Sequence, residues 1–177
     1  MRFALAAAII ALPFGAFAAG SDDTEPPKPT QTSTECTKAQ VWDEKTKTCV
    51  DAQSGSLDDD ARFRAVRELA YAGRPEEALI VLSAMTEGDT DRVLTYKGFA
   101  HRKAGRPDLG MDYYARALEQ NPDNILARSY LGQMLVEMGE IAAARRQLDE
   151  IRIRGGAGSW AEASLSQAVG TGQTLSY

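Results

Sequence analysis

The tetrapeptide AGRP occurs twice, beginning at Ala72 and Ala104, and each copy lies between two stretches with helical hydrophobic spacing. A third glycine in the same setting gives anchors at Gly73, Gly105 and Gly139, roughly 34 residues apart. Glycine suits the left-handed residue that ends a helix, and the proline of the first two copies suits the first turn of the next helix. The pattern predicts an all-α, short right-handed solenoid of about three helix hairpins.

The middle unit, RVLTYKGFAHRKAGRPDLGMDYYARALEQNPDN, resembles the tetratricopeptide repeat. Its small residue Gly98, turn glycine Gly105 and closing proline Pro122 match the family pattern. Two residues depart from it, because Lys97 stands where a leucine is expected and Gly110 where alanine is preferred. The resemblance implies repeats at about 59–90, 91–124 and 125–154.

Capping motifs mark the two ends of the predicted repeat region, 56–154. Ser56 lies three residues ahead of Asp59 and predicts the start of the first helix. After the break GGAGS, Ser159 and Glu162 form an S-x-x-E capping box. This motif predicts a helix over 159–169 that covers the open end of the last repeat, followed by a disordered tail over 170–177.

The first 18 residues contain one cation, Arg2, followed by a short apolar run, and they end with the small residues Ala16 and Ala18. This is typical of a secretory signal peptide cleaved after Ala18. An uncleaved anchor is the alternative, but the run falls below the roughly 20 apolar residues that span a bilayer. We therefore expect a periplasmic or secreted protein. Residues 19–35, acidic and proline-rich, are predicted to form a disordered tether.

Cys36 and Cys49 are the only two cysteines. An exported chain passes through an oxidising compartment, so a disulfide that staples a small hairpin over 36–50 is expected. A redox-active pair is the alternative, and it lacks the C-x-x-C spacing. A zinc site lacks ligands, because His101 is the only histidine. We predict no metal and no cofactor.

Catalysis is not supported by the sequence. A Ser-His-Asp set could form only around His101, which occupies a position that the resemblance assigns to helix packing. AGRP lacks the lysine of a phosphate-binding loop. The net charge of −5, concentrated before residue 61, argues against nucleic acid as a partner. No membrane span is predicted after removal of the signal peptide.

The family resemblance implies a concave face formed by the first helix of each repeat. Arginine and aromatic residues at its open positions favour a peptide segment that bears carboxylates. The alternative is a solvated helix face on which long side chains cover apolar surface. The predicted peptide-binding residues are Phe63, Arg67, Tyr71, Arg92, Phe99, Arg102, Lys103 and Gln133, with Thr95, Ser129 and Glu137 at equivalent positions.

These observations lead us to expect a non-catalytic adaptor or assembly factor that holds a peptide segment of an envelope or secreted protein. One alternative is an accessory subunit that regulates an envelope enzyme, such as a cell-wall hydrolase or protease, through the hairpin. A third is an enzyme in its own right. The acidic tether suggests a further hypothesis, in which it folds back over the basic concave face and competes with partners.

Overall fold

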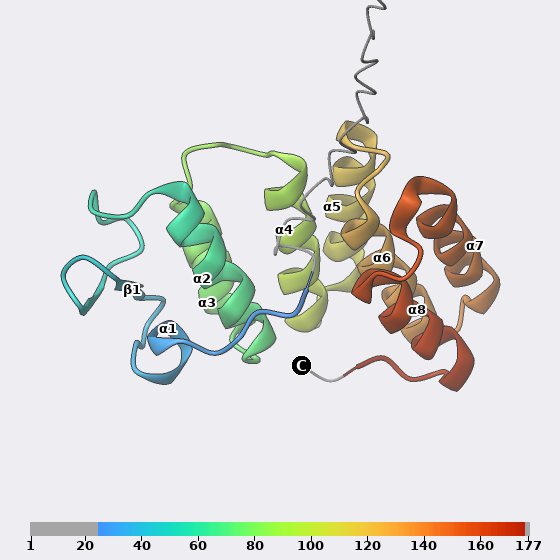
Figure 1. The fold of residues 1–177 in the computed structure, drawn as a ribbon, viewed down its shortest axis with the longest axis horizontal. Helices are drawn as coiled ribbons and strands as arrows, with labels where there is room; N and C mark the ends of the chain where they lie inside the picture. The colour runs from blue at the N-terminus through green and yellow to red at the C-terminus, as the bar shows by residue number, and fades with distance from the viewer. Residues whose placement is uncertain (1–24, 176–177) are drawn as a thin grey trace, which may run out of the picture.

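The computed structural model describes residues 25–175. The predicted signal peptide (1–18), the first part of the tether (19–24) and the last two residues lie outside this range. Three antiparallel helix pairs and a final helix follow one another along the described chain (Figure 1), so the predicted all-α solenoid is confirmed. The pairs are α2 (Asp59–Tyr71) with α3 (Pro75–Ser83), α4 (Asp91–Lys103) with α5 (Pro107–Gln120), and α6 (Ile125–Glu137) with α7 (Ile141–Ile151), and the last helix is α8 (Trp160–Thr171).

The repeated glycines end the first helix of each pair, as predicted. Gly73, Gly105 and Gly139 have φ angles of 72°, 75° and 80°, a region in which a side chain is strained. In each turn the amide that follows the glycine donates to a carbonyl five residues back, which satisfies a carbonyl that the helix leaves unpaired. Pro75 and Pro107 then occupy the first positions of α3 and α5, where no amide donor is needed.

The start of α2 differs from the prediction. Asp58, not Ser56, caps the helix, and its carboxylate accepts a 2.7 Å hydrogen bond from the amide of Ala61. Asp58 has the extended backbone of a capping residue, and it sits one position before the first helical residue. At the other end of the chain, Ser159 caps α8 as predicted and accepts from the amide of Glu162.

The two departures of the middle repeat from the family pattern both have structural explanations. Gly98 of α4 and Gly110 of α5 face each other, and a Cβ at Gly110 would lie 3.1 Å from the Gly98 carbonyl oxygen. Alanine at Gly110 would thus require the two helices to move apart by a few tenths of an ångström. Lys97 lies half-buried over the ring of Tyr113 and pairs with Asp89, so its stem packs while its charge is compensated.

The N-terminal module, residues 31–57, covers the outer end of the first repeat. It holds one helical turn, α1 (Gln31–Thr34), and the antiparallel strands β1 (Val41–Asp43) and β2 (Thr48–Val50). Cys36 and Cys49 form the predicted disulfide. Val41 and Leu57 are buried in the same core cluster as Phe63 of α2. The module thus belongs to the solenoid core and supplies the cap that an exposed repeat end requires.

The described part of the predicted tether does not behave as a disordered segment. Glu68 of α2 accepts hydrogen bonds from the Thr30 amide and hydroxyl, both 2.6 Å, and from the Ser33 amide at 2.9 Å. These donors belong to the N-terminus of α1, where unpaired amides need an acceptor. A buried carboxylate on the first repeat therefore orders a segment that has no large apolar residue of its own.

The arginines of the two AGRP copies contact the preceding unit. Arg74 donates to backbone carbonyls of the N-terminal module, among them Cys36 at 3.0 Å, and pairs with Glu77. Arg106 pairs at 2.6 Å with Glu76 of the first repeat. The same turn position thus joins the first repeat to the module and the second repeat to the first.

The C-terminal end is more ordered than predicted. Helix α8 continues to Thr171, and Gly172 ends it in the left-handed conformation. The Thr174 hydroxyl then donates to Glu137 of α6 at 2.7 Å. Only residues 176 and 177 of the predicted tail lie outside the described range, so the disorder predicted for 170–175 is not what the structure shows.

Candidate peptide-binding face

The eight predicted residues lie on the first helices α2, α4 and α6, as the repeat frame predicted. Aromatic rings connect these helices. The Phe63 and Tyr96 rings meet edge to face at 5.3 Å between centroids, and Tyr71 stacks on Phe99 at 5.3 Å. Phe99 in turn lies 4.6 Å from Tyr130 of α6. We call Phe63, Tyr71, Tyr96, Phe99, Tyr130 and Trp160 the aromatic row.

Three members of the aromatic row were missed by sequence reasoning. Tyr96 and Tyr130 lie 34 residues apart at the same repeat position, so their recurrence was a signal that went unused. Trp160 begins α8, and its ring centroid lies 6.3 Å from those of both Tyr71 and Tyr130. No repeat position predicts it, because α8 follows a glycine-rich break and not a repeat turn.

Hydroxyl groups join the row on its polar side. The Nε of Arg67 donates to the Tyr96 hydroxyl at 3.2 Å, and the Tyr71 and Tyr130 hydroxyls lie 2.6 Å apart. Burial raises the pKa of Tyr130 well above its ordinary value, and the neighbouring tyrosines add to this effect. The Tyr130 hydroxyl therefore stays protonated, and the hydroxyl network links α2, α4 and α6.

Burial divides the predicted residues into two groups. Phe63, Arg67, Phe99, Arg102 and Gln133 are buried, whereas Tyr71, Arg92 and Lys103 are half-buried. The repeat frame treated all eight positions as open to a partner. The five buried side chains instead contribute to packing between neighbouring helices, and their direct contact with a peptide stays a prediction.

Charged members of the face are paired across repeats. Arg102 makes a two-pronged ion pair with Glu137 of α6, at 2.7 and 2.6 Å. Burial by itself would raise the pKa of Glu137, but the Arg102 guanidinium outweighs it and the pKa lies below its usual range. Arg92 pairs with Glu87 and lies over the Phe63 ring, 4.7 Å from its centroid.

Lys103 and Gln133 occupy different surroundings. The Lys103 ammonium lies 5.7 Å from the centroid of the Phe99 ring, and its pKa is lowered by burial and by nearby Arg102. Gln133 belongs to a buried polar cluster with Ser129 and Ser164, which docks α8 on α6. Lys103 is therefore a cation of the face, and Gln133 serves the end cap.

A segment of the chain itself lies against the first helix of this face. Arg67 donates to the backbone carbonyl of Glu25, and the neighbouring Glu68 accepts from Thr30, which lies five residues after Glu25. The segment approaches α2 from α1 and leads toward α4 in Figure 1. Both contacts use backbone groups, and Glu68 also accepts from the Thr30 hydroxyl. The α2 surface thus has the chemistry to hold a peptide backbone.

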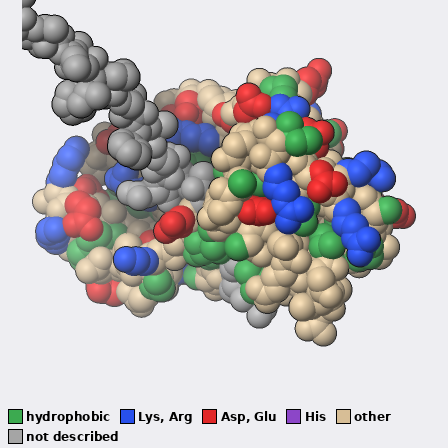
Figure 2. All heavy atoms as spheres, turned by 45° about the vertical axis from the view of Figure 1, so that its right-hand side comes forward, with side chains coloured by type: hydrophobic (Ala, Val, Ile, Leu, Met, Phe, Trp, Pro, Cys, Tyr) green, Lys and Arg blue, Asp and Glu red, His purple; other side chains and the backbone are tan. Residues whose placement is uncertain are grey.

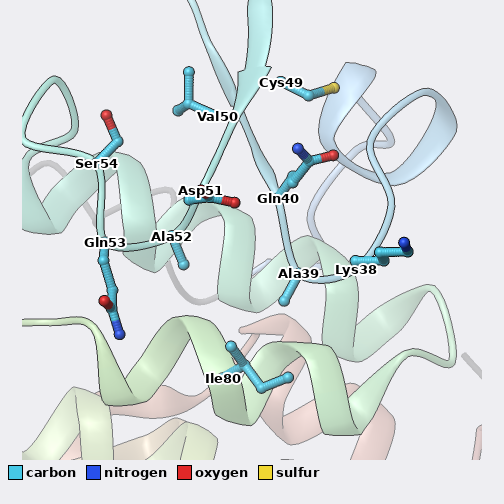
Figure 3. Close-up of a pocket in the computed structure, with 10 residues that line it drawn as sticks. All are labelled: Lys38, Ala39, Gln40, Cys49, Val50, Asp51, Ala52, Gln53, Ser54 and Ile80. Carbon is cyan, nitrogen blue, oxygen red and sulfur yellow. The ribbon is translucent and has the colours of Figure 1, made fainter.

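A second concavity lies between the N-terminal module and α3. It encloses about 710 Å³ and is walled by the loop before β1, by the residues that follow β2, and by Ile80 of α3 (Figure 3). Ile80 is 53 % exposed and contributes an apolar side chain to the lining of this hollow. Lys38, Gln40, Asp51 and Gln53 make the other walls polar.

Residues 25–175 offer little to other kinds of site. No group of three His, Cys, Asp or Glu side chains is placed to hold a metal ion in this range. His101 accepts a hydrogen bond from Arg106 and stacks on Tyr113, which is a packing role. None of the described helices is long and apolar enough to cross a membrane. Figure 2 shows basic and acidic side chains interspersed on the face it presents, not a patch of one sign.

Comparison with known proteins supports the repeat assignment. No match to the chain was found among curated proteins or among solved structures. Residues 101–163 match the sequence model of the tetratricopeptide repeat family. The matched stretch runs from the end of α4 to the start of α8, and so spans the second and third turns. This match, with the helix pairs and turn glycines, supports a tetratricopeptide-repeat protein, a class whose repeats suggest a protein-interaction or adaptor role.

Proposed function

We propose that this protein is an exported, non-catalytic adaptor that holds an extended peptide segment of an envelope protein on its concave face. The observation that carries the proposal is the contact of residues 25–30 with α2. There, Arg67 binds the backbone carbonyl of Glu25, and Glu68 binds the backbone amide and the hydroxyl of Thr30. Groups that recognise a backbone in this way recognise peptides by shape and main chain.

Two half-buried members of the face, Tyr71 at the end of α2 and Lys103 at the end of α4, extend this surface from α2 to α4. Tyr71 belongs to the aromatic row, and Lys103 brings a cation over the Phe99 ring. An aromatic surface beside a cation favours a segment with a carboxylate or a C-terminal acid. Export is proposed from the N-terminal sequence, and mass spectrometry of the purified protein should then find a chain that begins at Ala19.

Site-specific photo-crosslinking tests the adaptor role. A photoreactive residue in place of Lys103 should capture a partner from cell envelopes, whereas one in place of Arg145, exposed on the second helix of the third repeat, should not. A synthetic peptide copied from the captured segment should then bind the purified protein, and Lys103→Glu should weaken binding at least about fivefold while Arg145→Glu leaves it unchanged. Equal capture at both positions would contradict the proposal.

The hollow beside the hairpin favours a second candidate, an accessory subunit that regulates an envelope enzyme through the N-terminal module. Exposed Ile80 and the polar wall give this hollow the mixed character of a protein contact. Photo-crosslinking from Trp42 separates the two candidates. Capture from Trp42 alone favours the module as the contact, and capture from Lys103 alone favours the concave face.

A further inference from the structure

A small hollow lies between strand β1 of the N-terminal module and one side of α2. It encloses about 180 Å³, whereas one water molecule needs only about 10–15 Å³. Val41, Leu57, Ala61 and Ala65 contribute apolar groups to its lining. The hollow therefore has room for a slender ligand with an apolar stem.

A buried carboxylate with an unused oxygen belongs to this hollow. Successive side chains of a strand point to opposite faces, so Asp43 lies on the same face of β1 as Val41, which packs against α2. Asp43 is only 3 % exposed. Its Oδ1 accepts from the Lys45 amide at 2.8 Å, but no donor within residues 25–175 makes a hydrogen bond to the buried Oδ2. Buried acceptors are nearly always paired, and the turn that Oδ1 closes does not explain Oδ2.

The charge around this oxygen is negative. Four carboxylates and two cations line the hollow, which gives it a net charge of −2: Asp43, Glu44, Asp58, Glu68, Lys45 and Arg64. The other three acids have partners of their own in the fold, whereas Asp43 keeps one oxygen unused. The Ser56 hydroxyl and the Lys45 amide hold the pKa of Asp43 below its usual range, so its carboxylate is charged at neutral pH. A buried charge without a partner is costly, so a cation is the ligand that would stabilise this hollow.

The surroundings of Asp43 distinguish between kinds of cation. A calcium ion takes about six to eight oxygens, and no three His, Cys, Asp or Glu side chains of the described range are placed to hold a metal. A guanidinium binds both oxygens of a carboxylate side by side, but Oδ1 is already used by Lys45. A primary ammonium is a compact donor that needs one oxygen, and its alkyl stem can lie along an apolar wall.

We propose that the hollow between β1 and α2 binds a primary ammonium group on an alkyl stem, with the charge at Asp43 and the stem along Val41, Leu57 and Ala65. Glu44 and Lys45 line the hollow with exposed side chains, which can move to admit the ligand. A lysine side chain of a partner protein and a free alkylamine share this chemistry. The site does not depend on the proposed function, because its test needs no partner of the concave face.

Titrations followed by two-dimensional NMR of the backbone amides test the site. N-acetyl-lysine N-methylamide represents a lysine side chain and n-butylamine a free amine, while N-acetyl-norleucine N-methylamide and n-butanol are their uncharged counterparts. The two amines should shift the amides of residues 41–45 and 56–58 with a dissociation constant on the order of 1 mM, and the uncharged compounds should not. Tighter binding of the lysine derivative assigns the site to a protein side chain, whereas equal or tighter binding of n-butylamine assigns it to a free amine.

Two variants and a matched control locate the charge. Asp43→Asn keeps the size of the side chain and an oxygen for the Lys45 amide, and it should weaken amine binding at least about tenfold. Asp51→Asn removes an exposed acid of the same module outside the hollow, and it should leave the affinity within about twofold. If Asp43→Asn does not fold, Ala61→Leu decides, because it fills the hollow, leaves Asp43 in place and should abolish binding.

Four results would overturn the proposal. They are the absence of shifts with both amines, equal shifts with the uncharged compounds, unchanged affinity of the folded Asp43→Asn or Ala61→Leu variant, and tighter binding of calcium chloride than of either amine at the same amides. Each of them leaves the adaptor role of the concave face to its own crosslinking test.

Discussion

Replacement of Gly98 by alanine tests the close approach of α4 and α5. A Cβ at this position would lie 2.6 and 2.7 Å from two carbon atoms of the Tyr114 ring. Carbon atoms in contact prefer about 3.5–4.0 Å, so the ring must move by roughly 1 Å. Tyr114 is fully buried and has little room to move.

The change in the free energy of unfolding expected for Gly98→Ala is the difference between two effects. Overpacking of a well-packed core costs about 1–3 kcal/mol. Alanine regains up to about 1 kcal/mol over glycine inside a helix. Gly98→Ala should therefore lower the free energy of unfolding by about 1–2 kcal/mol, which corresponds to a fall in Tm of about 3–8 °C for a chain of this size.

A matched control is present in the same chain. Gly170 lies inside α8 on the exposed surface, and a Cβ there would meet no atom within 4 Å. Gly170→Ala should therefore leave the Tm unchanged or raise it by about 1–3 °C. Thermal unfolding followed by circular dichroism measures both variants. If Gly98→Ala unfolds at or above the wild-type Tm, the close approach is not a constraint and the reasoning is wrong.

The remaining predictions concern the cap and the inter-repeat contacts. Cys36→Ser/Cys49→Ser should destabilise the chain to urea by about 3 kcal/mol, and an added reductant should have no further effect on this variant. His101 accepts a hydrogen bond from Arg106 only when its imidazole is neutral, and burial lowers the pKa of His101 below 6.5. The contribution of His101 to stability should therefore be complete above about pH 6.5 and fall as the pH drops below it. His101→Gln should remove this dependence of Tm on pH. Arg74→Ala should lower the free energy of unfolding by about 1–3 kcal/mol and speed hydrogen exchange in residues 31–50, because it leaves carbonyls of the module without their donor. Arg106→Ala should lower the free energy of unfolding by less than about 1 kcal/mol, because its partner Glu76 is exposed. Equal exchange rates in the two arginine variants would contradict the assigned role of Arg74.

Local sequence signals predicted the repeat architecture well. Gly73 and Gly105 adopt the left-handed conformation that the pattern required, and the prolines begin the next helices. These features depend on the preferences of single residues, so a sequence states them directly. The disulfide hairpin was predictable from the two cysteines, because a chain that is expected to be exported has few other uses for a single pair 13 residues apart.

Tertiary contacts decided what the sequence could not show. Residues 25–35 contain no large apolar residue, and their order depends on charged side chains of the first repeat that lie about 35 to 42 residues later, Glu68, Arg67 and Arg74. The concave face illustrates the same limit. The repeat frame correctly placed Phe63 and Phe99 on first helices, but Tyr96 and Tyr130 pack against them, and no local pattern gives the depth of that packing.

The AGRP arginine has a consequence for how such a protein can be lengthened. Arg74 binds carbonyls of a disulfide-bonded module, and Arg106 binds a carboxylate of a repeat, yet both extend from the same turn. The joint therefore accepts two chemically different neighbours without a change in its own sequence. A duplicated copy of residues 91–124, inserted between the first two repeats, would bring Asp108 opposite the next AGRP arginine, where Glu76 now lies opposite Arg106. The joint would keep its pairing of opposite charges while both caps stay the same.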